Sequence, residues 1–137
     1  MPNIVVEYSA NIADEADIPG LCRRIASTVI EAGQGAFAVA AVRVRAYRAD
    51  DYVIGDGDPS YAFVNITARL AKGRSEADRV RTFGAVWEAV KAHLEPVERM
   101  WTLAISMDVE EFADRMAYKQ NRIHEKLGTK PFAKATG

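Results

Sequence analysis

The sequence predicts an α+β fold in which two β-α-β units form a four-stranded mixed sheet with two helices on one face. Two observations predict it: two long segments alternate between apolar and polar residues, and two others carry apolar residues at helical spacing. The units cover about residues 1–47 and 61–107, and they match strand to strand and helix to helix when one is shifted onto the other. The 137 residues suit one domain with a hydrophobic core.

The first unit begins with a predicted strand at 3–9, followed by a helix at 14–31 and a strand at 37–47. Acidic residues in the first turn of this helix would stabilise its N-terminus, and Gly33 and Gly35 are expected to break the chain after it. The helix carries the acidic residues Asp14, Glu15 and Asp17, and its apolar stripe comprises Ile18, Leu21, Cys22, Ile25 and Val29.

The second unit follows a glycine-containing loop at 50–60 and repeats the plan of the first. We predict a strand at 61–70, a helix at 76–94 and a strand at 101–107. The helix is expected to begin at a capping box formed by Ser75 and Asp78 and to carry an apolar face of Val80, Phe83, Trp87, Val90 and Leu94.

The two long strands each have one apolar face and one mixed face. The apolar faces should lie under the helices, and the mixed faces need another cover, which predicts a homo-oligomer. The apolar positions are Ala38, Ala40, Val42, Val44 and Ala46 in one strand and Ala62, Val64, Ile66, Ala68 and Leu70 in the other. The mixed positions are Val39, Ala41, Arg43, Arg45 and Tyr47 in one strand and Tyr61, Phe63, Asn65, Thr67 and Arg69 in the other.

The composition excludes several classes of function. The net charge is −1 and 49% of the residues are hydrophobic, so we expect neither nucleic acid nor a membrane as a partner. The single cysteine, Cys22, fits a reducing cytoplasm and core packing. His93 and His124 lack metal-ligand spacing, so no metal site is predicted.

The residue with the clearest chemical potential is Pro2, which follows the initiator methionine. Removal of Met1 would expose a secondary amine at the start of a strand. An α-amino group ordinarily titrates at ~7.7–8.0, and nearby cations or desolvation lower its pKa further, so Pro2 is a candidate general base. The dipeptide alone is more typical of an ordinary start before an edge strand, and the rest of the chain favours the catalytic interpretation.

Arginines supply the candidate anion-binding groups. Arg43 and Arg45 share one strand face, and Arg74 lies between a strand end and a helix start, where free N–H groups favour anions. An ion-paired strand face and a surface turn are the alternative interpretations of these arginines. Glu7 is either a structural partner for one of them or a catalytic acid.

These features together resemble the tautomerase superfamily, and the chain is most similar to its 5-carboxymethyl-2-hydroxymuconate isomerase family. The resemblance runs along most of the chain, although Asn3 replaces a histidine that commonly follows the proline. The segments that carry it include Pro2, Val6-Glu7-Tyr8-Ser9, Val42-Arg43-Val44-Arg45, Tyr61-Ala62-Phe63-Val64, Gly73-Arg74-Ser75, Lys119-Gln120-Asn121 and His124.

The resemblance implies a cofactor-independent keto-enol isomerase of aromatic-compound catabolism, assembled as a homotrimer and acting on a small carboxylated substrate. It implies Pro2, Arg43 and Arg74 as catalytic residues and Arg45 as a substrate-binding residue. We expect one domain at 1–127 that ends in a short helix beginning near Lys119, Gln120 and Asn121. The tail at 128–137 departs from the family pattern and is expected to be flexible.

Two other functions stay open from the sequence alone. The first is a proline tautomerase of another substrate, such as phenylpyruvate or a halogenated acrylate, for which Glu7 is the nearby carboxylate that could activate water. The second is a non-catalytic oligomeric module that binds small acids or a protein partner.

Overall fold

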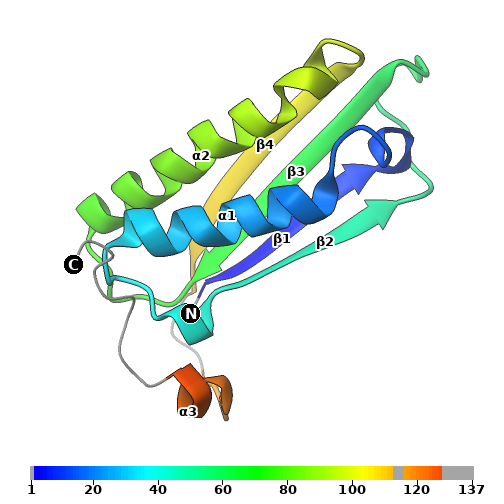
Figure 1. Cartoon of the computed structure of the whole chain (residues 1–137). Coiled ribbons are helices and arrows are strands. Elements are labelled where there is room, and N and C mark those ends of the chain that lie inside the picture. The colour runs from blue at the N-terminus through cyan, green and yellow to red at the C-terminus, as the bar shows by residue number, and fades with distance from the viewer. Residues whose placement is uncertain (1, 113–115, 128–137) are drawn as a thin grey trace.

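The computed structural model describes residues 2–112 and 116–127. Its centre is a four-stranded mixed sheet in the order β2-β1-β3-β4. β1 pairs in parallel with β2 and antiparallel with β3, and β3 pairs in parallel with β4. The two long helices, α1 and α2, lie side by side across one face of the sheet (Figure 1). The predicted α+β architecture of two β-α-β units is therefore confirmed.

The first unit starts with β1 (Asn3–Ser9), as predicted, and continues through a 3₁₀ turn, η1 (Ala10–Ile12), into α1 (Ile18–Gly33). The predicted start of the helix at residue 14 is wrong, and its first turn holds no acidic residue. Asp17 instead caps the helix, because its side chain accepts a hydrogen bond from the Gly20 N–H. The predicted stripe faces the core, with Cys22 only partly buried.

The strand predicted at 37–47 is displaced along the chain. Val39–Ala41 forms a second 3₁₀ turn, η2, and β2 occupies Arg43–Ala49. Phe37 ends up fully buried ahead of this turn, so the apolar run of the segment reflects two different structures. Ala38 and Ala40 therefore do not belong to the strand, and β2 places its later apolar residues, Val44 and Ala46, against the core.

The second unit consists of β3 (Tyr61–Leu70), α2 (Glu76–Glu98) and β4 (Thr102–Glu111). The bounds of β3 are as predicted, whereas α2 and β4 extend beyond the predicted ends. Ser75 caps α2 by accepting from the Asp78 N–H, as expected. The predicted apolar face of the helix needs correction: Val80 is 65% exposed, Trp87 is half-buried, and the buried positions are Thr82, Phe83, Val86, Val90, Leu94 and Val97.

The short C-terminal helix, α3 (Ile123–Leu127), begins later than predicted. Asn121 precedes it: the side-chain carbonyl accepts from the Ile123 N–H, and its amide donates to the Ala40 carbonyl of η2. Asn121 thus attaches α3 to η2 of its own chain. The tail predicted at 128–137 lies outside the described residues, as does Met1.

The core lies between the helices and one sheet face. All the even positions of β3 are buried in it, from Ala62 to Leu70, together with Ile4 and Val6 of β1. The opposite face of the sheet, called the uncovered face below, is not covered by α1 or α2 (Figure 1). None of the helices within residues 2–112 and 116–127 has the length and apolar character needed to cross a membrane.

Candidate active site

Pro2 lies at the start of the central strand β1 and is buried. Its carbonyl accepts a hydrogen bond from the Arg43 N–H at 3.2 Å, which ties the start of β1 to the start of β2. The parallel pairing of the two strands then continues from Asn3 opposite Arg43. The backbone therefore holds the candidate amine in a fixed place, as a general base requires.

Two arginines flank the residue after Pro2. Asn3 is opposite Arg43 in β2 and opposite Arg69 in β3, so these side chains form one row on the uncovered sheet face. Arg45 lies one row further, beside Val5, and is exposed. The structure thus brings Arg43 next to Pro2 and places Arg45 on the same face, two residues further from the amine.

Arg74 follows β3 and precedes α2, at the same end of the sheet as Pro2. Its Nε donates to the Ala36 carbonyl at 3.2 Å and its Nη1 to the Ala71 carbonyl at 3.4 Å. The guanidinium also lies over the Phe37 ring, 4.9 Å from the centroid. These contacts fix the side chain, and a guanidinium has five N–H donors, so donors are left for an anion.

Glu7 lies at the other end of β1. It is exposed, and it is opposite Tyr47 in β2 and Asn65 in β3. It is five positions along the chain from Pro2, which places the two Cα atoms roughly 16 Å apart within one chain. Among the ion pairs of the described residues, none involves Glu7. Glu7 therefore meets neither expectation within its own chain: it pairs with no arginine and cannot activate water beside Pro2.

Sequence reasoning missed Arg69 as a member of this site. Its position on the mixed face of its strand was predicted, but its proximity to Pro2 follows from the antiparallel pairing of β1 with β3. The order and direction of strands in a sheet are set by long-range packing, which the alternation of side chains does not report.

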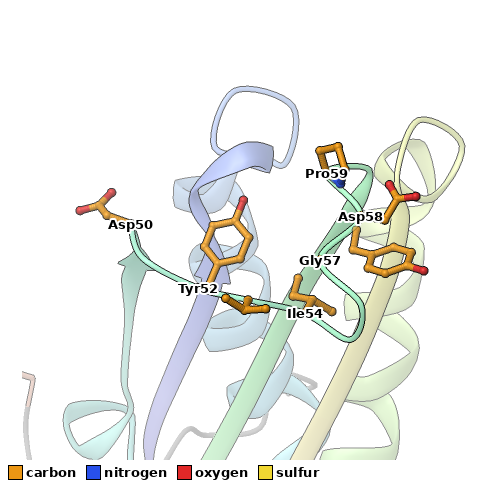
Figure 2. A pocket seen from close by; sticks show the side chains of 8 residues that line it. Asp50, Tyr52, Ile54, Gly57, Asp58 and Pro59 are labelled. Carbon is orange, nitrogen blue, oxygen red and sulfur yellow. The ribbon is translucent and has the colours of Figure 1, made fainter.

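A cavity of about 350 Å³ lies at the opposite end of the sheet, in the loop between β2 and β3. Figure 2 shows Asp50, Tyr52 and Asp58 among the side chains around it. The N–H and hydroxyl of Ser60 bind the Asp58 carboxylate and lower its pKa, whereas a hydrogen bond to Asp56 raises the pKa of Tyr61. Anionic carboxylates in and beside this cavity oppose binding of an acidic substrate.

No group of three or more histidine, cysteine, aspartate or glutamate side chains that could hold a metal occurs in the described part of the chain. Cys22 is a free thiol whose pKa is raised by burial, which keeps it protonated and poorly nucleophilic.

Comparison with known proteins gives relatives that share nearly the whole chain. The sequence is 35% identical over 124 residues to 5-carboxymethyl-2-hydroxymuconate Delta-isomerase of Escherichia coli, covering 90% of this chain and 97% of that one. The fold matches the crystal structure of a 5-carboxymethyl-2-hydroxymuconate isomerase from Deinococcus radiodurans R1 with a TM-score of 0.85, at 29% identity over 92% of this chain and 93% of that one.

A more distant likeness shows the fold alone. A fused 4-OT, wild type, solved as a symmetric trimer, matches with a TM-score of 0.59 at 20% identity, covering 87% of this chain and 95% of that one. The fold expected from the tautomerase resemblance is therefore confirmed. Residues 2–127 match the sequence model of the 5-carboxymethyl-2-hydroxymuconate isomerase family, and the chain belongs to that family.

Proposed function

We propose that this protein isomerises 5-carboxymethyl-2-hydroxymuconate, or a closely related 2-hydroxydienoate, from its dienol to the conjugated ketone. The observation that carries the proposal is the family match over residues 2–127, which begins at the candidate catalytic residue itself. The backbone bond between Pro2 and Arg43 supports it, because the amine and a guanidinium-bearing residue are fixed side by side.

Pro2 acts as the acid and base once Met1 has been removed. The neutral amine takes the proton of the substrate's 2-hydroxyl group, and the resulting ammonium gives a proton to a distal carbon of the conjugated system. One O–H bond breaks and one C–H bond forms, so no oxidant, reductant or cofactor is needed. A single group suffices because both positions belong to one conjugated system, and a positioned proton transfer of this kind contributes ~10²–10⁴-fold.

The arginines orient the substrate and stabilise its charge. Arg43 and Arg74 bind carboxylate oxygens and the negative charge that spreads over the dienolate, and Arg45 binds a further part of the substrate. Their positive charge also disfavours protonation of the neighbouring amine and so favours the neutral form of Pro2 near pH 7. Each role requires a fixed side chain, and the contacts of Arg74 with Ala36 and Phe37 provide one.

The working form is a homotrimer in the cytoplasm. The uncovered face of the sheet carries half-buried apolar side chains such as Val5 and Phe63 beside polar ones. A sheet face of this character ordinarily packs against another layer, and equivalent subunits supply that layer through repeated copies of one contact. We expect the substrate to bind where the Pro2 end of one sheet meets a neighbouring subunit.

The proposal is tested by following the ultraviolet absorbance of 5-carboxymethyl-2-hydroxymuconate with untagged protein whose intact mass has been measured. Conversion well above the spontaneous rate, by protein that has lost Met1, is the expected result. Faster conversion of phenylpyruvate would assign a different substrate to the same scaffold. A chain that retains Met1 and converts neither compound would favour a binding module and contradict the proposal.

A further inference from the structure

We propose that Arg69 is an additional substrate-binding residue, which binds a carboxylate remote from the reacting 2-hydroxyl group. This inference rests on the proposed function, because it assigns a ligand to a residue beside the same amine. It goes beyond the arginines identified from the sequence, since Arg69 becomes a neighbour of Pro2 only through the pairing of β1 with β3.

The register of the sheet places Arg69 symmetrically to Arg43. Both are opposite Asn3, one on each side, and both lie on the uncovered face. Adjacent strands are ~4.7–4.9 Å apart, so the two Cα atoms lie roughly 10 Å from one another across the start of β1. Long side chains from both positions can bind opposite ends of one small polycarboxylate between them.

The guanidinium of Arg69 is held in place by an aromatic ring. It lies over the Phe112 ring, 4.6 Å from the centroid. Glu110 is its register partner in β4, but the ion pairs within residues 2–112 and 116–127 include neither residue. The adjacent acid, Glu111, pairs instead with Arg79 at 3.1 Å. A guanidinium stacked on a ring and lacking an ion pair keeps its N–H donors for an anion.

The proposed substrate class carries several carboxylates that the Arg69 guanidinium could bind. A muconate has a carboxylate at each end, and a carboxymethyl substituent adds a third. Arg43, Arg45 and Arg74 supply one cation for each of these carboxylates, and the dienolate that forms during the reaction adds a further negative charge. Across the uncovered face, Arg43 and Arg69 lie on either side of the start of β1, whereas the carboxylates are Glu7 at the far end of β1 and Asp108 and Glu110 on β4. The substrate is thereby attracted toward the amine.

The test compares Arg69→Met and Arg69→Lys with the parent on substrates that differ in carboxylate number: 5-carboxymethyl-2-hydroxymuconate, 2-hydroxymuconate and 2-hydroxy-2,4-pentadienoate. Arg48→Met is the matched control, since Arg48 is an exposed strand arginine at the far end of the sheet, paired with Asp50. We expect Arg69→Met to lower kcat/KM on the polycarboxylates by roughly 10- to 100-fold, mainly through KM, because a charged hydrogen bond to bound substrate is lost.

The same variant should convert the monocarboxylate at the parental rate, and Arg69→Lys should recover part of the loss. An equal loss on all substrates, or no loss on any, would overturn the inference. Ligand-detected NMR with adipate and hexanoate gives a readout that needs no turnover. Weaker adipate binding by Arg69→Met, with hexanoate binding unchanged, supports the inference even if the proposed reaction fails. Equal adipate binding by parent and variant contradicts it.

Discussion

Single residues at the start of β1 combine two requirements that usually conflict. The amine of Pro2 must be basic enough to remove a proton, and it must also be neutral near pH 7. In the proposed mechanism, a cation such as Arg43 meets the second requirement, because like charge disfavours the ammonium form, and the same cation stabilises the substrate anion.

A substitution of Arg74 distinguishes a role in substrate binding from a role in stabilising the fold. Arg74→Ala should reduce kcat/KM for 5-carboxymethyl-2-hydroxymuconate by roughly 10- to 100-fold and should affect 2-hydroxy-2,4-pentadienoate much less, because a charged hydrogen bond to a carboxylate disappears. Steady-state kinetics on both substrates make the comparison. The substitution also removes contacts to Ala36, Ala71 and Phe37, so a thermal melt is needed beside the kinetics. Equal loss on both substrates with a lowered Tm would show that Arg74 only supports the fold.

The sequence was sufficient to select Pro2, Arg43, Arg45 and Arg74 as site residues, and these assignments stay predictions. It could not select Arg69, because residues far apart in the chain become neighbours through strand order. It also raised Glu7 as a candidate that the strand geometry excludes for its own chain. Strand alternation assigns a side chain to a face, but only the register tells which end of that face it shares with Pro2.

At the scale of elements, several boundaries are set by side chains that the periodicity does not reveal. α1 begins where Asp17, with a φ of 45°, turns the chain and caps the Gly20 N–H. It ends where Arg81 of α2 donates to the Ala32 carbonyl at 2.8 Å and to the Gly33 carbonyl at 3.1 Å. Capping bonds of this kind pair the backbone N–H and C=O groups that a helix end otherwise leaves unpaired. The two bonds from Arg81 also join the second β-α-β unit to the first. The predicted helix bounds were therefore approximate.

Arg81→Met should lower the free energy of unfolding by about 1–2 kcal/mol, because the last carbonyls of α1 lose charged donors. Urea denaturation measures this loss. Arg99→Met is a suitable control, since Arg99 makes only an exposed pair with Glu95 and its removal should cost well under about 1 kcal/mol. Equal effects of the two substitutions would show that the Arg81 bonds to α1 contribute little.

The same arginine makes part of this stability dependent on pH. Arg81 holds the pKa of Asp78 below its ordinary value, through a hydrogen bond. A lowered pKa in the folded state contributes stability above the ordinary aspartate pKa, and this contribution is lost as the pH falls through the folded-state pKa. The difference in stability between the parent and Asp78→Asn should therefore be present at pH 7 and shrink below about pH 4. A difference that is constant between pH 7 and pH 3 would contradict this account.

The strand and helix order was predictable, whereas two details of the elements were not. The apolar run at 37–47 was predicted to be one strand, although it contains the η2 turn ahead of β2, which continues to Ala49. Val80 was assigned to the core face of its helix, yet it borders an apolar groove of about 500 Å³ between α2 and β4. Short apolar segments satisfy more than one periodicity, so tertiary packing decides between them.

At the scale of the whole molecule, the uncovered sheet face is the feature that a single chain leaves unexplained. The helices fully bury the two central strands on the other face, where the core includes Ile4, Val6, Val64 and Ile66, and partly bury the outer strands β2 and β4. The uncovered face carries exposed small and polar residues on β4, among them Ala104 and Ser106. A trimer that covers this face would complete the sheet's second layer and place the Pro2 end of each chain against a neighbour.

Ala104→Glu should weaken that assembly, because a charge would enter the covered face of every subunit. Sedimentation velocity should show the parent near three times the 15.1 kDa chain mass and the variant shifted toward the monomer. Ala92→Glu is the matched control, since Ala92 is exposed on α2, on the helical side. A monomeric parent, or a variant that assembles like the parent, would contradict the trimer.

The central claim is that the amine of Pro2 is the acid and base, and the most direct test compares Pro2→Ala with the parent on 5-carboxymethyl-2-hydroxymuconate. Alanine also permits removal of Met1, so the variant keeps an N-terminal amine, but a primary and differently placed one. Pro59→Ala, in the loop at the far end of the sheet, controls for loss of a proline. We predict a fall in kcat of roughly 10²–10⁴-fold for Pro2→Ala with an unchanged melting curve, and none for Pro59→Ala. Parental activity in Pro2→Ala would contradict the account.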